Sequence, residues 1–404
     1  MKLDLEQFIF ALSDTVDLVG VDEILHGKRV AFMAWKCAKA MGFDEERSRR
    51  LFHLGLLHDC GVSSSEERGH LVQELEWDNS HIHSQIGAKR LESFEPLSVF
   101  AQPILYHHTR WERLKGIDLR PSIKTEANLI YLIDRIDYLC QTTPGSNMLA
   151  KKNIVRHKVN SLKEIYFSSE LVDVFLEVSA NEAFWFSLEP YMLLLFINDQ
   201  KKSQQPIDLP SDNLKKIAHL FAEIVDAKSP YTAEHSIGVA NLSRLLAEKS
   251  GLDKDTQLKV EVAGLLHDLG KLQVPDRVLE SSEPLADEDL SFMRHHSYMT
   301  YRILNNIKGL EEIATWSGNH HEALDGSGYP FRRTAEELSI ESRIIAIADI
   351  FQALAQTRPY RSARPLSIIL DSLQAHSDRG RLDQDIVACV LSNSSACYES
   401  AIGA

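Results

Sequence analysis

The chain has 404 residues, which is enough for two or three domains at roughly 150 residues each. A hydrophobic content of 44% and a charged content of 25% are typical of a globular protein that folds in water. The formal charge of −14 disfavours binding along a nucleic-acid polymer, because such proteins need a basic face to neutralise phosphates.

The cysteines and the N-terminus indicate a cytoplasmic location. The five cysteines are scattered and form no CxxC pair, so we expect reduced thiols. The N-terminal stretch MKLDLEQFIFALSD carries acids within its short apolar run and lacks the basic flank of a signal peptide. The longest apolar run, 191–198, is far shorter than the roughly 20 residues that span a bilayer. We therefore expect no membrane segment.

Helical periodicity dominates the chain. Apolar residues recur at helical spacing in five segments, namely 30–41, 213–225, 237–249, 260–267 and 344–355. Gly42, Gly251 and Gly270 follow three of these segments and are expected to end helices. Alternation of the strand type is almost absent, so the fold class predicted is all-α.

A polar stretch divides the chain. Residues 200–211 (QKKSQQPIDLPS) contain proline, serine and glutamine and are the best candidate linker. We expect one helical domain over 1–150, a helical connector and linker over 151–211, and a second helical domain over 212–404.

Histidines and aspartates repeat along the chain in one order. Seven positions recur: His26, His58, Asp59, His83, His107, His108 and Asp134 first, then His235, His267, Asp268, His296, His320, His321 and Asp349. The offset between copies grows from 209 to 213 to 215 residues, as expected when loops change length but helices do not. The pattern predicts two tandem helical bundles related by duplication.

These residue types suit metal ions. Neutral imidazoles and carboxylates bind iron, manganese, nickel or zinc. Two ions bridged by a carboxylate can activate a water and stabilise both oxygens of a phosphoryl displacement. The positions are distant in sequence, but helix ends can converge on one point in a bundle.

Two motifs carry a family resemblance. LLHDLGK ends at Lys271, and NHHEALDGSGYP contains the second histidine pair. With KSPYTAEHSIGVA, IAIADIFQAL and TRPYRSARP, they make residues 212–404 resemble the HD-GYP phosphodiesterases, a branch of the HD metal-dependent phosphohydrolases. The resemblance implies a phosphodiesterase that opens a cyclic dinucleotide to a linear 5'-phosphorylated product. Cyclic di-GMP is the default substrate, and 3',3'-cyclic GMP-AMP stays open.

The resemblance also implies roles in the second copy. A first metal would be held by His235, His267, Asp268 and Asp349, and a second, bridged through Asp268, by His296, His320 and His321. His296 is preferred over His295 because its spacing to the next pair repeats that of His83. Three-metal members carry Glu where this chain has Tyr231, so we expect two divalent ions of iron, manganese or nickel.

Substrate contacts follow from the same resemblance. Asp268 and Lys271 are the expected catalytic residues, with Lys271 on the scissile phosphate. The loop bordering the nucleotide would be built by Gly326, Gly328, Tyr329 and Pro330, and weaker candidates for substrate contacts are Arg358 and Arg361.

The first copy differs outside its ligand positions. It lacks the GYP loop, and Val62 stands where the second copy has Lys271. It is expected to be a regulatory copy, with an enzyme of altered specificity as the alternative, and whether it holds metal stays open.

The expected partner is the cyclic dinucleotide itself. A diguanylate cyclase or a response regulator could be a signalling partner, and a homodimer is left open. The rival hypothesis is a catalytically silent receptor that binds a cyclic dinucleotide and signals to a partner.

Overall fold

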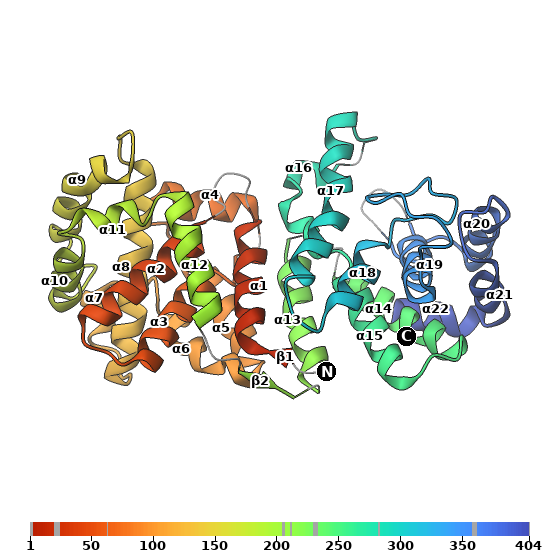
Figure 1. Ribbon diagram of the computed structural model, residues 1–404, viewed down its shortest axis with the longest axis horizontal. Coiled ribbons are helices and arrows are strands. Elements are labelled where there is room, and N and C mark those ends of the chain that lie inside the picture. Colours follow the sequence, from red (N-terminus) through yellow and green to blue (C-terminus); the bar gives the residue numbers. More distant parts are fainter. Residues whose placement is uncertain are drawn as a thin grey trace. The chain divides into compact units, whose positions relative to one another are not determined.

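The computed structural model describes residues 3–19, 25–62, 64–203, 207–210, 212–228, 233–281, 283–357 and 362–403. It is built almost entirely of helices, which confirms the predicted all-α class (Figure 1). Backbone contacts divide it into two compact units, Leu5–Ile207 and, with Met1–Asp4, Asp208–Ala404. Two short strands, β1 (Leu3–Asp4) and β2 (Asp208–Leu209), pair antiparallel in the second of these units.

The N-terminal unit is drawn from red to yellow-green in Figure 1. Its helices are α1 (Leu5–Asp17), α2 (His26–Ala40), α3 (Glu45–Leu57), α4 (Ser65–Gln73), α5 (Ser80–Glu92), the 3-10 helix η1 (Glu95–Phe100), α6 (Ala101–Leu105), α7 (Trp111–Leu114), α8 (Pro121–Thr142), α9 (Met148–Asn160), α10 (Ser169–Val178), α11 (Glu182–Phe186) and α12 (Pro190–Ser203). Residues 151–203, most of the segment expected as a connector and linker, fall in α9 to α12 of this unit, whereas β2 falls in the other unit.

The C-terminal unit runs from green to blue in Figure 1. Its helices are α13 (Asn213–Asp226), α14 (Ala233–Lys249), α15 (Lys254–Leu266), the 3-10 helix η2 (Leu269–Gln273), α16 (Asp276–Leu279), α17 (Asp287–Leu304), α18 (Glu311–Gly318), α19 (Ile340–Ala355), α20 (Leu366–Asp378), α21 (Gln384–Ser392) and α22 (Ser394–Ile402).

The two units use the same packing pattern. In the first, α2 packs on α3 and α8, and α5 packs on α6. In the second, α14 packs on α15 and α19, and α17 packs on α18. Each of these helices carries or immediately precedes a position of the repeat. The duplicated sequence therefore folds into duplicated helix pairs whose apolar faces are buried, including Phe32, Phe52 and Phe351.

Two of the three expected helix stops have the left-handed backbone that favours glycine, with φ of 75° at Gly42 and 78° at Gly251. Gly270 has another role, because its helix already ends at Leu266. A Cβ on Gly270 would lie 2.0 Å from the carbonyl oxygen of His296. Gly61 stands equally close to His83, so this repeated glycine lets the helix with the third histidine approach the His-Asp pair.

None of the helices in the described part of the chain combines the length and the apolar character that a bilayer crossing requires.

Candidate active site

The seven repeated positions of the second copy come together, and we call them the C-terminal centre. They reach it from five places in the fold: α14 (His235), the end of α15 (His267 and Asp268), α17 (His296), the segment after α18 (His320 and His321) and α19 (Asp349). Three subsets of these residues have potential ligand atoms within 4.8 Å of one another. His296 is in the cluster and buried, whereas His295 faces outward, beside Gln273.

Asp268 lies between the two groups of histidines. Its Oδ2 atom is 3.6 Å from Nε2 of His235 and 3.2 Å from Nε2 of His267. Its Oδ1 atom is 3.3 Å from Nε2 of His296 and 3.9 Å from that of His320. A carboxylate placed in this way can offer one oxygen to each of two ions.

Asp349 completes the enclosure from α19. Its Oδ1 atom lies 3.2 Å from Nε2 of His235 and 3.8 Å from Nε2 of His267. Its other oxygen lies 3.9 Å from Nδ1 of His321. Asp268, just after α15, and Asp349, on α19, therefore both face the imidazoles of His235 and His267.

Backbone carbonyls orient the imidazoles. Nδ1 of His267 donates to the carbonyl of Gly264 at 2.7 Å, and Nδ1 of His320 donates to that of Ser317 at 2.6 Å. Each acceptor lies three residues earlier in the chain, which directs Nε2 toward the centre. A hydrogen bond of this kind fixes the tautomer of a metal-ligating histidine.

Unpartnered polar atoms in the centre fit a bound cation. Nε2 of His267 and Oδ1 of Asp268 are buried and have no hydrogen-bond partner. Buried polar atoms without a partner are rare and call for an explanation such as an ion. The donor set of imidazole nitrogens and carboxylate oxygens suits divalent transition metals. The residues present therefore fit a metal centre.

The protonation states agree with that fit. Burial lowers the pKa of His321 to about 3, and burial also holds the pKa of His320 well below its ordinary value. Burial alone would raise the pKa of Asp268, but the charges of His267 and Lys271 hold it well below the usual range. At His267 burial lowers the pKa, but the charge of Asp268 outweighs burial and raises it. Neutral imidazoles at His320 and His321 and an ionised carboxylate at Asp268 are the forms that bind metals.

Lys271 stands at the edge of the centre. It lies in η2, and its ammonium group pairs with Oδ2 of Asp268. Its side chain is 19% exposed, whereas that of Asp268 is 2% exposed. The charge is thus next to the bridging carboxylate while the flexible stem reaches solvent, from where it can meet a substrate phosphate.

Glu322 fastens the glycine-rich loop to the histidine pair. Its carboxylate accepts from the backbone N–H groups of Phe331 at 2.7 Å, Arg332 at 3.1 Å and Arg333 at 3.0 Å. The loop is also pressed against the pair, since a Cβ on Gly328 would lie 2.4 to 2.6 Å from three backbone atoms of 321–323. The loop is therefore a rigid border of the site.

The loop forms one wall of an open pocket of about 650 Å³. The Tyr329 ring lies 4.8 Å from the His321 ring, and the Arg294 guanidinium lies 5.6 Å from the Tyr329 ring. The pocket is lined by Ser291, Arg294, His295, Tyr298, Ser327, Gly328, Tyr329, Pro330 and Arg332. Aromatic rings and guanidinium groups suit bases and phosphates.

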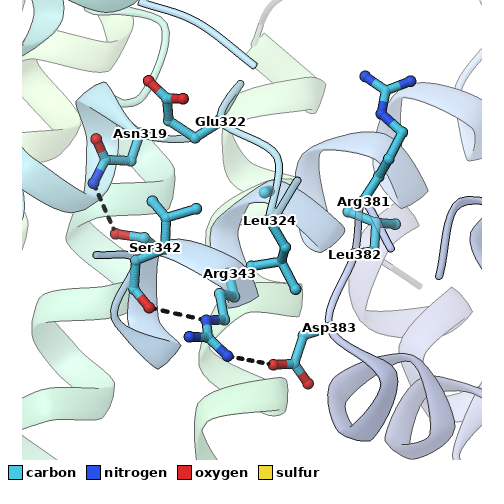
Figure 2. Close-up of a pocket in the computed structure, with 10 residues that line it drawn as sticks. Asn319, Glu322, Leu324, Ser342, Arg343, Arg381, Leu382 and Asp383 are labelled. Atoms are coloured by element: carbon cyan, nitrogen blue, oxygen red, sulfur yellow. Dashed lines mark hydrogen bonds and ion pairs between the residues drawn. The ribbon is translucent and has the colours of Figure 1, made fainter. Parts of the chain in front are cut away.

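A second, small cavity lies under the loop. It measures about 10 Å³, enough for roughly one water. Figure 2 shows Asn319 bonded to Ser342, and Arg343 paired with Asp383 at 2.8 Å, around it. This cavity is too small for a nucleotide, so the larger pocket is the candidate substrate site.

The first copy also brings its seven positions together, and we call them the N-terminal centre. Nε2 of His26 lies 3.1 Å from Nε2 of His58, and Nε2 of His83 lies 3.3 Å from that of His107. Two subsets have potential ligand atoms within 4.8 Å of one another, and they are His26, His58 and Asp59, and His83, His107 and His108. A pocket of about 400 Å³ opens beside His108.

The partner of the first histidine differs between the centres. His235 donates from Nδ1 to the amide oxygen of Gln352 at 2.5 Å. His26 donates instead to Asp137, at 2.7 Å. Burial opposes a charged imidazole at His26, but hydrogen bonds with Asp134 and Asp137 outweigh it and raise its pKa to about 10.

An arginine accompanies that exchange. Arg29 donates to both oxygens of Asp137, at 2.5 and 2.9 Å. The repeat places Gly238 at the position of Arg29, and a Cβ there would already lie 2.8 Å from Gln352. The two positions therefore differ together, with Arg29 and Asp137 in the N-terminal centre and Gly238 and Gln352 in the C-terminal centre.

Several functional residues were not predicted from the sequence. Glu322 and Gln352 stand three residues or fewer from expected ligands, and that proximity was the available signal. Arg135, which pairs with Asp134, directly follows it and had the same signal, whereas Arg68, which pairs with Asp59, lies nine residues further along the chain and had none. The expected residues Tyr231, Arg358 and Arg361 lie outside the described residues.

Two HD-domain family models match the chain, over residues 24–139 and 219–386. The 3'3'-cGAMP-specific phosphodiesterase 1 of Vibrio cholerae serotype O1 is 36% identical over 99% of this chain and 94% of that protein. The chain belongs to the HD-GYP cyclic-dinucleotide phosphodiesterases.

A further relative matches a smaller share of this HD-GYP chain, and a solved structure matches nearly all of it. The cyclic di-GMP phosphodiesterase response regulator RpfG of Xanthomonas campestris pv. campestris is 36% identical over 40% of this chain and 43% of that protein. A crystal structure of the V. cholerae cyclic GMP-AMP specific phosphodiesterase V-cGAP3 matches with a TM-score of 0.67 and 22% identity. It covers 97% of this chain and 98% of that one, and shows that the fold is shared.

Proposed function

We propose that the chain hydrolyses 3'3'-cGAMP at the C-terminal centre. The observation that carries this choice of substrate is the extent of the first match, which includes both HD copies and 94% of a protein named as 3'3'-cGAMP-specific. RpfG, named as a cyclic di-GMP phosphodiesterase, matches over only 40% of this chain. The default expectation of cyclic di-GMP therefore gives way to 3'3'-cGAMP.

The seven residues of the C-terminal centre would hold two divalent ions of iron, manganese or nickel. Such ions, when bound, supply an activated water and charge stabilisation for an in-line displacement at phosphorus. Asp268 would be a ligand shared by the two ions, because its two oxygens face different histidines. Oriented imidazoles keep the remaining ligand atoms pointed inward.

The chain's other residues would bind and position the substrate. Lys271 would turn from Asp268 to the scissile phosphate and stabilise its developing negative charge. Tyr329 would offer its ring to a base, and Arg294 would contact a phosphate or stack beside that ring. Gly328 lets the loop lie against the histidine pair, which keeps this pocket next to the metals.

The partners, assembly and location of the chain do not follow from the chemistry of the C-terminal centre. We keep as proposals a signalling partner of the diguanylate-cyclase or response-regulator type, a homodimer, a cytoplasmic location and a regulatory role for residues 1–150.

The test uses the purified full chain loaded with Mn²⁺ or Fe²⁺. It is incubated with 3'3'-cGAMP and with cyclic di-GMP, separately and in competition, and products are resolved by chromatography. We expect a linear 5'-phosphorylated dinucleotide, formed faster from 3'3'-cGAMP. Faster cleavage of cyclic di-GMP would overturn the substrate choice. Absence of linear product from both, with metal bound, would favour the silent receptor.

A further inference from the structure

Guanidinium groups balance the buried carboxylates of the N-terminal centre. Each of three aspartates pairs with an arginine: Asp59 with Arg68 at 2.8 Å, Asp134 with Arg135 at 2.8 Å, and Asp137 with Arg29 at 2.5 Å. All six side chains are less than a tenth exposed. The charges therefore cancel within the protein, without a cation from solution.

The C-terminal centre has no such balance. Among the described residues, Lys271 pairs with Asp268, and the ion pairs of Asp349 are with histidines alone. The repeat places Ile350 where the first copy has Arg135. Negative charge is thus left over for divalent cations.

Arg135 is held in place by further hydrogen bonds, and Arg68 is buried. Besides Asp134, Arg135 donates to the backbone carbonyls of Leu71 at 3.0 Å and Glu74 at 2.7 Å. Arg68 is buried, with a side chain 4% exposed. A metal ion beside His26 would compete with the buried arginines for Asp59 and Asp134. Repulsion between the ion and the guanidinium groups is screened poorly in the protein interior.

Arg135 borders the other half of the centre, since the Asp134 oxygen that it pairs with lies 3.8 Å from Nε2 of His108, but this half holds three histidines that face one another. Nδ1 of His107 donates to the carbonyl of Ile104 at 2.6 Å, which points Nε2 toward His83. Nε2 of His108 is buried without a hydrogen-bond partner. Three converging imidazoles form a ligand set for zinc and similar ions and leave a fourth position open.

An access route leads to these imidazoles. The pocket of about 400 Å³ is lined by His108 together with Trp77, His81 and Arg113. A metal site needs such a route as well as ligands.

We propose that the N-terminal centre binds a single divalent transition-metal ion on His83, His107 and His108. Arg68 would take the place that we propose for a first ion in the C-terminal centre, because it pairs with the Asp59 oxygen that lies 3.5 Å from Nε2 of His26. A ligand could reach such an ion from the pocket that His108 lines. This ion is separate from those proposed for hydrolysis.

The test counts metal in the full chain. The protein is stripped with chelator, reloaded with Zn²⁺, freed of unbound metal and measured by elemental analysis beside His83→Ala and His26→Gln variants. We expect His83→Ala to lose one ion per chain and His26→Gln to lose none. Loss of an ion in His26→Gln would indicate two ions. An unchanged count in His83→Ala would indicate none. Either result overturns the proposal.

A second variant guards against misfolding. If His83→Ala lacks a cooperative thermal transition by circular dichroism, His108→Gln carries the test, because His108 lies at the pocket edge. It must also lose the ion, and an unchanged count rejects the proposal. Hydrolysis of 3'3'-cGAMP is assayed in parallel. Its absence in the unmodified protein would reject the proposed function while leaving the difference in metal count to stand.

Discussion

In the N-terminal centre Asp59 and Asp134 pair with buried arginines. In the C-terminal centre Asp268 pairs with Lys271, whose side chain is partly exposed. Asp349, among the described residues, forms ion pairs with histidines. Both centres keep all seven ligand positions. If hydrolysis is confined to the C-terminal centre, as we propose, the difference teaches that retained histidines and aspartates do not by themselves indicate a hydrolytic metal centre, because neighbouring charges also determine how favourably a cation binds.

The chain after the histidine pair differs as well. In the C-terminal copy Glu322 binds three backbone N–H groups and holds the loop that borders the pocket. Thr109 stands at that position in the N-terminal copy, and Arg110 beyond it pairs with Glu76. The two pockets therefore occupy corresponding places but offer different walls to a ligand.

The largest expected effect comes from the bridging carboxylate. Asp268→Ala should reduce 3'3'-cGAMP turnover to background and lower bound metal, because both oxygens of Asp268 face ligand histidines. Turnover and elemental analysis on one sample measure this. The matched variant Asp59→Asn should keep turnover, and full activity in Asp268→Ala would show that the site is misassigned.

Lys271→Met should follow in size. Removing one charged donor from a developing oxyanion costs about 10²–10³ in kcat, and the metal content should stay unchanged because Lys271 is not a ligand. Steady-state kinetics with metal analysis tests this, with Lys259→Met as control, because Lys259 is half-buried like Lys271 but pairs with Glu312, away from the centre. A kcat within twofold of the unmodified protein would contradict the role.

Glu322→Gln should loosen the loop. Hydrogen bonds to a charged group contribute about 1.5–3 kcal/mol, so we expect roughly a 10- to 100-fold loss in kcat/KM. The loss should be mainly in KM, since the loop borders the substrate. Glu337→Gln, an exposed carboxylate nearby that accepts from Thr334, should change little. Equal kinetics for both variants would argue against the anchor.

Gln352→Ala should have the smallest effect. Loss of an orienting partner weakens metal affinity by about 10- to 100-fold, and the lower end is expected because Gln352 is uncharged. Metal titration of the stripped protein measures the affinity, with the exposed Gln384→Ala as control. An unaltered affinity would mean that the packing of His235, rather than its hydrogen bond, sets its orientation.

Much of the fold followed from the sequence. Helical periodicity predicted four helices of the C-terminal unit, α13, α14, α15 and α19, because their apolar faces recur regularly, and α13 begins at Asn213 as expected. The role predicted for Gly270 was wrong in part. Its close approach to His296, 26 residues along the chain, leaves no periodic signal in the sequence.

The candidate ligands also followed from the sequence, because the repeat gives each histidine a counterpart and the structure brings them together. What surrounds them did not. Arg68 reaches Asp59 from a different helix, and Gln352 acts through an amide oxygen. Such contacts depend on the three-dimensional direction of side chains, which spacing alone does not give.

We propose that 3'3'-cGAMP is hydrolysed at the C-terminal centre, and the most direct test is to measure hydrolysis by two full-length variants at equivalent positions of the repeat. His320→Ala and His107→Ala remove equivalent histidines, both buried and both bonded to a carbonyl three residues earlier. With folding checked by circular dichroism, we expect no linear product from 3'3'-cGAMP in His320→Ala and near-normal turnover in His107→Ala. Turnover that survives in His320→Ala but disappears in a folded His107→Ala would contradict it.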